Sequence, residues 1–281
     1  MTVQLMITCD DAALSHGINQ SVTDLYERGM ASAASLMTNF PQVDEAFAYF
    51  EDYPELELGV HLNLSDGKPL TDIAKHSDLV RGSGKFHDRF ILFAYSVFPS
   101  DNLLSIMREE MTAQIEVFTK AGKKPAHLTT HCHFHVFPSL RNLVYELAEE
   151  YDVQWVRNSN FRMSVMPFNP MLTIEGNGNN DVPHDFFVPN YIVSMQHWLD
   201  HPPSQLLNDI LKLDGTVELV LHPSIEKDEH YPTDVRYLPD ERHKETVYIE
   251  QFFELLEPYL GGEVEVVNGK QSDKQAKQAK L

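Results

Sequence analysis

Cysteine is scarce in this sequence, which has only Cys9 and Cys132 among its 281 residues. Two cysteines cannot build the disulfide framework of a secreted domain in a chain of this length. The first residues, MTVQLMITCDDA, lack the basic start and long apolar run of a secretory signal, and no apolar run reaches the length of a transmembrane helix. Together these absences predict a cytoplasmic protein that does not insert into a membrane.

Basic residues are also few. Lys and Arg total 22 against 42 Asp and Glu, which gives a formal net charge of −20. An acidic surface of this kind repels phosphate backbones and anionic lipids, so we expect neither nucleic acid nor a membrane surface as a partner. The charge does not disfavour a small neutral substrate, and it leaves a homo-oligomer open.

Several common catalytic motifs are missing. GSGK at 82–85 lacks the full phosphate-binding loop pattern, because Phe86 stands where Ser or Thr should follow. His131 and His135 have the spacing of a zinc-protease helix, but Cys132 replaces the required Glu. No GxSxG elbow is present, which argues against a serine esterase.

The sequence does contain a regular alternation of short apolar segments, typical of strands, with amphipathic segments typical of helices. Strands are predicted near 3–8, 31–39, 56–64, 126–136, 153–157, 216–223 and 263–269, and helices near 15–29, 43–53, 100–122, 139–151 and 245–259. This alternation predicts an α/β fold, a single (β/α) barrel with parallel strands that spans residues 1–268. Residues 63–100 are loop-like, GNGNND at 176–181 is expected to be an exposed turn, and 269–281 are predicted to be disordered.

Acidic and imidazole side chains stand at the carboxyl ends of four predicted strands, where barrel enzymes carry their chemistry. These residues are Asp10, Asp11, His61, His131, His133, His135 and His222. On the histidine-rich strand, alternation predicts that the odd-numbered residues from 127 to 135 share one face. Two imidazoles and one carboxylate make a three-ligand set that leaves an open position, as in catalytic metal sites. One of the adjacent aspartates could ligate the ion while the other acts as general base, and spacing alone does not assign which.

Each of these residues also has a purely structural interpretation. The aspartate pair could begin a helix capped by Ser15, and a single His61 is more often a hydrogen-bonded core residue than a ligand, by roughly four to one. The HCHFH stretch could be an exposed strand face, and His222 could simply end a strand. Cys9 and Cys132 are expected to be small buried thiols on the outward faces of their strands. The metal hypothesis is favoured because four separate structural explanations would otherwise have to coincide at one end of a barrel.

Four motifs, in order, resemble the YdjC-like carbohydrate deacetylases, which include the chito-oligosaccharide deacetylases. They are ITCDDAALSHGIN, GVHLNLSDGKPL, KPAHLTTHCHFHVFP and LVLHP, spread from residue 7 to 223. The resemblance implies a distorted β/α barrel, a divalent metal ion and removal of an N-acetyl group from an amino sugar. It further implies that the metal ligands are Asp11, His61 and His131, that Asp10 is the general base, and that His222 protonates the departing amine. Ligand softness favours zinc, whereas the family allows magnesium.

The chain departs from the family pattern at two places. Thr129 and Thr130 stand where Asp-Ser is usual before the histidine, and Ala12 and Ala13 stand where Phe-Gly is usual after the aspartate pair. If the missing Asp orients a ligand histidine, its loss weakens metal binding or activity by roughly 10- to 100-fold unless a hydroxyl takes its place. Two alternatives stay open, the first motivated by the Thr129 departure and the second by the same set of metal ligands. One is a non-catalytic metal- or sugar-binding barrel, and the other is a metal-dependent phosphoesterase, which the absence of Arg or Lys near the motifs disfavours.

Overall fold

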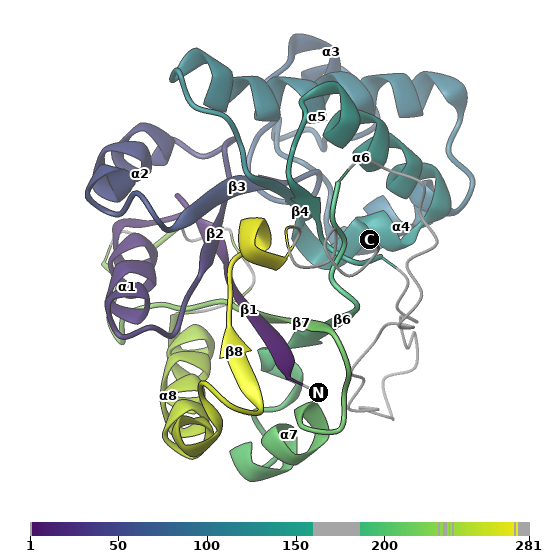
Figure 1. Ribbon diagram of the computed structural model, residues 1–281. Helices are drawn as coiled ribbons and strands as arrows, with labels where there is room; N and C mark the ends of the chain where they lie inside the picture. The colour runs from purple at the N-terminus through teal and green to yellow at the C-terminus, as the bar shows by residue number, and fades with distance from the viewer. Residues whose placement is uncertain are drawn as a thin grey trace.

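The computed structural model describes residues 2–159, 186–229, 231, 232, 235, 237, 239–272 and 274. Its strands form a parallel sheet in the order β5-β4-β3-β2-β1-β7-β6, and β8 pairs with the first residues of β1. The strands are β1 (Val3–Ala12), β2 (Ala33–Leu36), β3 (Glu57–Leu62), β4 (His127–Thr130), β5 (Trp155–Val156), β6 (Tyr191–Ser194), β7 (Thr216–Leu221) and β8 (Val264–Val266). The sheet curls into a half-barrel with helices packed around its outside (Figure 1). The prediction of a β/α barrel with parallel strands is therefore confirmed.

Phe187 adds one more backbone pairing at the β5 edge of the sheet. Its N–H donates to the carbonyl of Gln154, and its own carbonyl accepts from the N–H of Val156, both at 2.9 Å. A single parallel bridge joins Phe187 to Trp155 in β5, and the chain then continues into β6, which pairs with β7. This bridge brings the end of β5 close to the β6–β7 side of the sheet.

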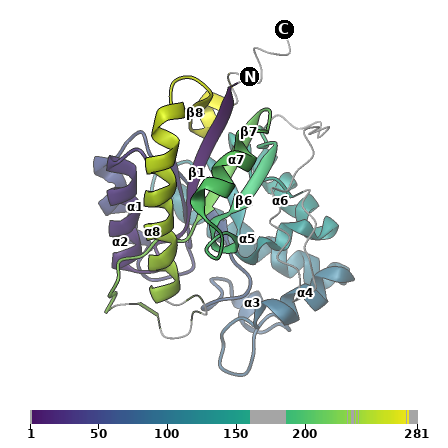
Figure 2. The same cartoon turned by 90° about the horizontal axis from the view of Figure 1, so that it is seen from below.

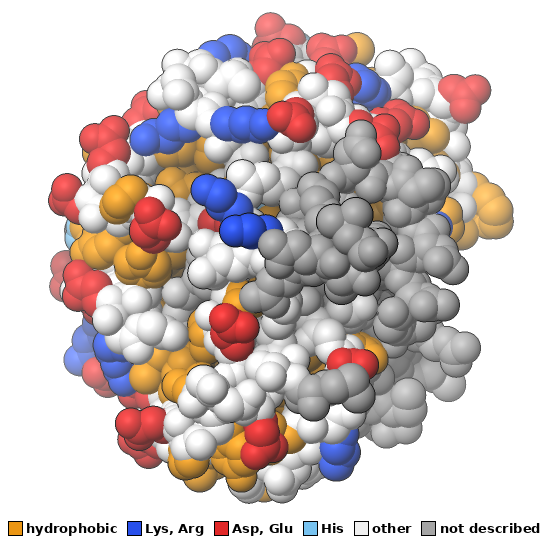
Figure 3. All heavy atoms as spheres, viewed as in Figure 1, with side chains coloured by type: hydrophobic (Ala, Val, Ile, Leu, Met, Phe, Trp, Pro, Cys, Tyr) orange, Lys and Arg blue, Asp and Glu red, His pale blue; other side chains and the backbone are white. Residues whose placement is uncertain are grey.

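Some helices begin at side-chain caps that the sequence encodes, whereas others start without one. Ser15 accepts the N–H of Ile18 at 3.3 Å, which is the predicted cap, and it starts α1 (His16–Glu27). The remaining helices are α2 (Val43–Tyr49), α3 (Asp72–Lys75), α4 (Arg89–Val97), α5 (Asp101–Lys120), α6 (Pro138–Glu150), α7 (Pro203–Ile210) and α8 (Pro239–Leu256). Figure 2 shows α1 and α8 side by side, where Arg28 pairs with Glu250. Acidic side chains are spread over the face seen in Figure 3, in keeping with the net charge of −20.

The prediction that residues 63–100 form only loops is wrong, because this region contains α3 and α4. The Asp88 carboxylate caps α4 by accepting the N–H of Phe90 at 2.9 Å. The α4 sequence, RFILFAYSV, is apolar on nearly every side, so it lacks the polar stripe by which a surface helix is usually detected. Phe90 remains 64% exposed as a result.

The histidine-rich strand is shorter than predicted. β4 ends at Thr130, and residues His131–Val136 form a 3-10 turn in which Cys132 and His133 have φ angles of 55° and 52°. The Thr130 hydroxyl bonds to Nδ1 of His135, and Nε2 of His135 lies 3.3 Å from the Asn158 carbonyl, so the chain folds back at once. The predicted alternation of faces is therefore wrong beyond Thr130.

The barrel interior below the strand ends is tightly filled. The His127 ring stacks on Trp155 with 4.2 Å between ring centroids, and its Nε2 lies 2.9 Å from the Ser35 hydroxyl. A Cβ atom on Gly59 would lie 2.3 Å from the His127 ring, so the neighbouring strand needs glycine at this position. Packing of this density leaves the open space of the barrel at the carboxyl ends of the strands.

The prediction of disorder from residue 269 onward is wrong for the first residues of this segment. Residues 269–272 are helical, and the N–H groups of Gly269 and Lys270 donate to the Glu57 carboxylate at 2.9 Å. Residues 275–281 and the predicted GNGNND turn lie outside the described residues. Within the described part of the chain, none of the helices is both long and apolar enough to cross a membrane.

Candidate metal centre and active site

Asp10 and Asp11 lie at the end of β1, where the strand is irregular. The pairing of β1 with β2 shifts register between Cys9 and Ala12, and Asp11 has a φ of 63°. Both aspartates are 1% exposed, and both line one pocket instead of alternating across the sheet. The irregular end of β1 therefore allows two adjacent carboxylates to serve the same site.

Asp10 is held by Arg157, which follows β5. The guanidinium donates to both carboxylate oxygens, at 2.6 and 2.8 Å, and also to Glu218 of β7 at 2.8 and 3.0 Å. Burial acts to raise the pKa of Asp10, but the charge and hydrogen bonds of Arg157, together with the nearby His61 and His222, outweigh it and hold that pKa well below its usual range. Asp10 is thus an ionised carboxylate in a fixed orientation.

His61 reaches the pocket from β3 and is oriented by Thr129 of β4. Its Nδ1 lies 2.7 Å from the Thr129 hydroxyl, and its Nε2 lies 3.3 Å from Oδ1 of Asp11. Burial lowers the pKa of His61, which favours the neutral ring. A ring that donates Nδ1–H to Thr129 presents the Nε2 lone pair toward Asp11, as a metal ligand requires.

His131 lies between two carboxylates. Its Nδ1 is 3.0 Å from Oδ1 of Asp11, and its Nε2 is 2.7 Å from Oδ2 of Asp66. Asp66 is fixed in turn by Asn63, whose side chain accepts the Asp66 N–H at 3.0 Å and donates to the Asp66 carbonyl at 2.6 Å. A carboxylate behind the histidine is the usual arrangement for a metal ligand, because it fixes which ring nitrogen is free.

Asp11, His61 and His131 fit a divalent metal ion. One ligand atom from each lies within 4.8 Å of the others, and all three side chains are buried. Two imidazoles and a carboxylate suit zinc and related ions and leave a coordination position for water or substrate. The residues that the sequence predicted as metal ligands are therefore brought together in space.

His222 enters the same pocket at the end of β7 and is held by Glu245 of α8. The Glu245 carboxylate accepts the backbone N–H of His222 at 2.7 Å and lies 3.3 Å from its Nδ1. Burial acts to lower the pKa of His222, but the charge and hydrogen bond of Glu245, with the charges of Asp10 and Asp11, outweigh it and raise that pKa above the ordinary histidine value. On the same face of α8, Arg242 donates to Oδ2 of Asp11 at 2.6 Å.

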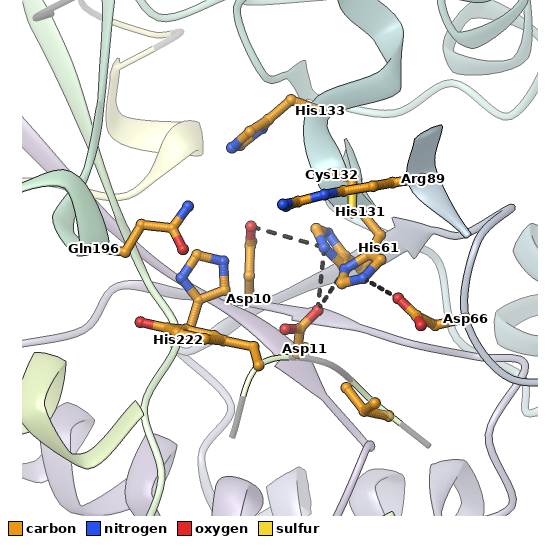
Figure 4. Close-up of a pocket in the computed structure, with 12 residues that line it drawn as sticks. Asp10, Asp11, His61, Asp66, Arg89, His131, Cys132, His133, Gln196 and His222 are labelled. Carbon is orange, nitrogen blue, oxygen red and sulfur yellow. Dashed lines mark hydrogen bonds and ion pairs between the residues drawn. The ribbon is translucent and has the colours of Figure 1, made fainter. Parts of the chain in front are cut away.

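Figure 4 shows Asp10, Asp11, His61, His131 and His222 around one pocket. Its lining consists of Asp10, Asp11, His61, Asp66, Arg89, His131, Cys132, His133, Gln196, His222, Val235 and Tyr237. All five residues predicted for catalysis or metal binding are included, and His133 joins them. His135 does not line the pocket, because it bonds to Thr130 and Asn158.

Sequence reasoning missed several residues of this site. Asp66 lies within the GVHLNLSDGKPL motif, and Arg157 ends a predicted strand. Their positions in the sequence could therefore have marked both as candidates for the site. Cys132 lines the pocket, so the prediction that it faces outward is wrong, whereas Cys9 is buried as expected. No Arg or Lys was expected near the motifs, and this counted against a phosphoesterase. That expectation is wrong for the folded chain, because Arg89 lines the pocket.

Comparison with known proteins shows the family to which this chain belongs. Residues 4–251 match the family model described as YdjC-like protein. The chain belongs to this family. Among curated relatives of this YdjC-like protein, the carbohydrate deacetylase of Brevibacillus brevis is 27% identical over 224 residues, which cover 76% of this chain and 84% of the relative. The carbohydrate deacetylase of Halalkalibacterium halodurans is 31% identical over 151 residues, covering 54% of this chain and only 62% of that protein's length.

A solved structure shares the fold. It comes from Enterococcus faecalis, where the protein is provisionally named a cellobiose-phosphate cleavage protein, and it aligns with a TM-score of 0.75 and 21% sequence identity. The alignment covers 96% of this chain and 99% of that one. At this level of identity, the likeness shows the common fold of the two chains and nothing of their substrates.

Proposed function

We propose that this YdjC-like protein is a metal-dependent hydrolase that removes the N-acetyl group from a small N-acetylated amino sugar or oligosaccharide. The observation that carries the proposal is the buried group of Asp11, His61 and His131 beside the ionised Asp10 in one pocket. The names of the curated relatives, carbohydrate deacetylase, support the same reaction.

Asp11, His61 and His131 would hold the divalent ion. An ion bound there supplies Lewis acidity, which polarises the acetamide carbonyl and stabilises negative charge that develops on its oxygen. The ligand set favours zinc by softness, while the family resemblance allows magnesium. Thr129 and Asp66 contribute by fixing the two ring orientations from behind.

Asp10 is proposed to accept a proton from the attacking water. Its carboxylate lies 3.8 Å from Nε2 of His61, at the edge of the proposed metal group, so a water there would be within its reach. The Arg157 guanidinium keeps Asp10 ionised and prevents its rotation away from the pocket. The cost of this arrangement is reduced basicity, because the guanidinium stabilises the carboxylate form.

His222 is proposed to protonate the departing amine. In the view of Figure 4 it lies on the far side of Asp10 from His61 and His131. The raised pKa produced by Glu245 keeps the ring protonated to higher pH than an ordinary histidine, as a proton donor requires. Proton acceptor and proton donor are then separate residues on two strands, each with a buried partner of opposite charge.

The reaction can be tested by acetate release from N,N′-diacetylchitobiose. The protein is first treated with a chelator and then supplied with zinc, magnesium or manganese, with His131→Ala assayed in parallel. His16→Ala is the matched control, because His16 is exposed and pairs with Glu45 away from the pocket. We expect chelation to abolish release, one ion to restore it, and only His131→Ala to prevent restoration. Release that persists without metal, or in His131→Ala, would contradict the proposal.

A non-catalytic metal- or sugar-binding barrel is the alternative that this assay separates. It would bind the ion or the sugar and release no acetate with any metal. The departure at Thr129 motivated this alternative, but the Thr129 hydroxyl lies against Nδ1 of His61 and supplies the orienting contact that an Asp would make. That contact favours the catalytic proposal.

A further inference from the structure

Asp66, His131 and Cys132 form a second group of metal-ligating side chains beside the first. One ligand atom from each lies within 4.8 Å of the others, and all three line the same pocket. The two groups share His131 but approach it from opposite sides, because Asp11 is near its Nδ1 and Asp66 is near its Nε2. An ion in the second group would thus occupy a different position from one held by Asp11 and His61.

The second group is held in place before any ion binds. Asn63 fixes the backbone of Asp66 through both its N–H and its carbonyl. Cys132 is set by a left-handed backbone with φ of 55°, and its Sγ lies 3.9 Å from the Ser65 hydroxyl. In tetrahedral zinc sites neighbouring ligand atoms are roughly 3.3–3.8 Å apart, as the bond lengths require. The 2.7 Å contact of His131 with Asp66 would therefore open by about 0.6–1.1 Å.

The chemistry of the two groups differs. The second contains a thiol, which binds as the thiolate and strongly prefers zinc, cadmium or copper(I) to magnesium or manganese. The first contains no sulfur among its three ligands. A soft ion is therefore expected to bind more tightly at the second position than a hard ion does.

We infer that Asp66, Cys132 and Nε2 of His131 form a second metal position that takes soft divalent ions and competes with the Asp11–His61–His131 group. The competition follows from the shared ring, since a neutral imidazole has only one unprotonated nitrogen. An ion on Nε2 shifts the proton to Nδ1, where it is donated to Asp11, and His131 is lost as a ligand of the first group. The inhibition of deacetylation that this competition implies rests on the proposed function, but the binding position itself does not.

Cadmium alone is a suitable probe of the position. Cadmium bound to a thiolate absorbs in the ultraviolet, so a titration of the chelator-treated full chain reports the Cys132 contact without any substrate. We expect the band in the wild type and in Cys9→Ser, and its absence in Cys132→Ser. Cys9 is the matched control, because it is the other cysteine of the chain and is buried away from the pocket. A wild type without the band, or a Cys132→Ser variant that keeps it, would overturn the inference.

Two further titrations test the shared ligands. Asp66→Asn should raise the cadmium concentration at half-maximal absorbance by about tenfold or more, because it removes an anionic ligand. Saturating manganese should raise the same midpoint in the wild type, since it holds His131 in the first group. An unchanged midpoint in Asp66→Asn would show that Cys132 binds alone, and an unchanged midpoint with manganese would show that the two positions are independent. Either result contradicts the inference.

The inhibition is measured separately by acetate release. Excess zinc should inhibit the wild type and Cys9→Ser, whereas Cys132→Ser should need about tenfold more zinc for the same inhibition. Equal inhibition of all three would overturn the regulatory role. If no variant releases acetate under any condition, the proposed function fails, and the cadmium titrations still decide the metal position.

Discussion

The Thr129 hydroxyl lies 2.7 Å from Nδ1 of His61, across the pairing of β4 with β3. The contact fixes the ring so that its other nitrogen is directed at Asp11, 3.3 Å away. A threonine at this position therefore does for His61 what a carboxylate commonly does for a metal-ligating histidine.

Replacing Thr129 by Val removes the hydroxyl and keeps the shape of the side chain. We expect the affinity for the restoring metal ion and the rate of acetate release to fall roughly 10- to 100-fold, because the His61 ring loses its orientation. Thr129→Ser should retain most of both, since it keeps the oxygen. Metal affinity is measured by titration of the chelator-treated protein, and a Val variant that binds metal like the wild type would contradict the assigned role.

Removal of Arg157 is expected to destabilise the folded chain. Arg157→Met would leave Asp10 and Glu218 buried without their common cation, which should cost about 3–5 kcal/mol in the free energy of unfolding. Arg28→Met is the matched control, because Arg28 pairs with Glu250 at the surface and should cost about 1 kcal/mol or less. Urea unfolding of both variants provides the comparison, and equal losses would show that the buried pairing contributes little.

The pH dependence of the reaction should depend on Glu245. His222 must be protonated to act as donor, so the rate should fall as pH rises through its pKa, which Glu245 raises. In Glu245→Gln that raising charge is gone, and the alkaline fall should move to lower pH. Glu250→Gln, a change on the same helix at the surface pair with Arg28, should leave the profile unchanged. A profile of kcat that is identical in wild type and Glu245→Gln would exclude this role.

Stability should fall in mildly acidic solution because of His127. Burial lowers the pKa of His127 from 6.5 to about 3, so between these values the unfolded chain binds a proton that the folded chain does not. Stability therefore rises with pH across this window, and it is lost as pH falls below 6.5, by up to about 1.4 kcal/mol per pH unit for this residue. Urea unfolding at about pH 7 and about pH 5.5 should show a smaller difference in His127→Gln than in wild type.

Local pattern was sufficient for the parallel β/α architecture and for the residues at the strand ends. Asp10, Asp11, His61 and His222 each follow a short apolar segment, and carboxyl ends of parallel strands meet at one edge of a sheet. The position of the pocket follows from that rule. The strand predicted from the alternation of residues in HCHFH was wrong beyond Thr130. The hydrogen bond between Thr130 and His135 turns the chain there, and the alternation of residue types does not reveal such a turn.

The charged residues that pair with Asp10, Asp11 and His222 were determined by the tertiary structure. Arg157 contacts Asp10 across 147 residues, and Arg242 contacts Asp11 across 231, so no local spacing links them. These contacts set the ionisation of both aspartates, and Glu245 does the same for His222. The residue types at the strand ends could be identified from the sequence alone. Their protonation and orientation depend on burial and on charges brought from distant segments, which only the folded structure supplies.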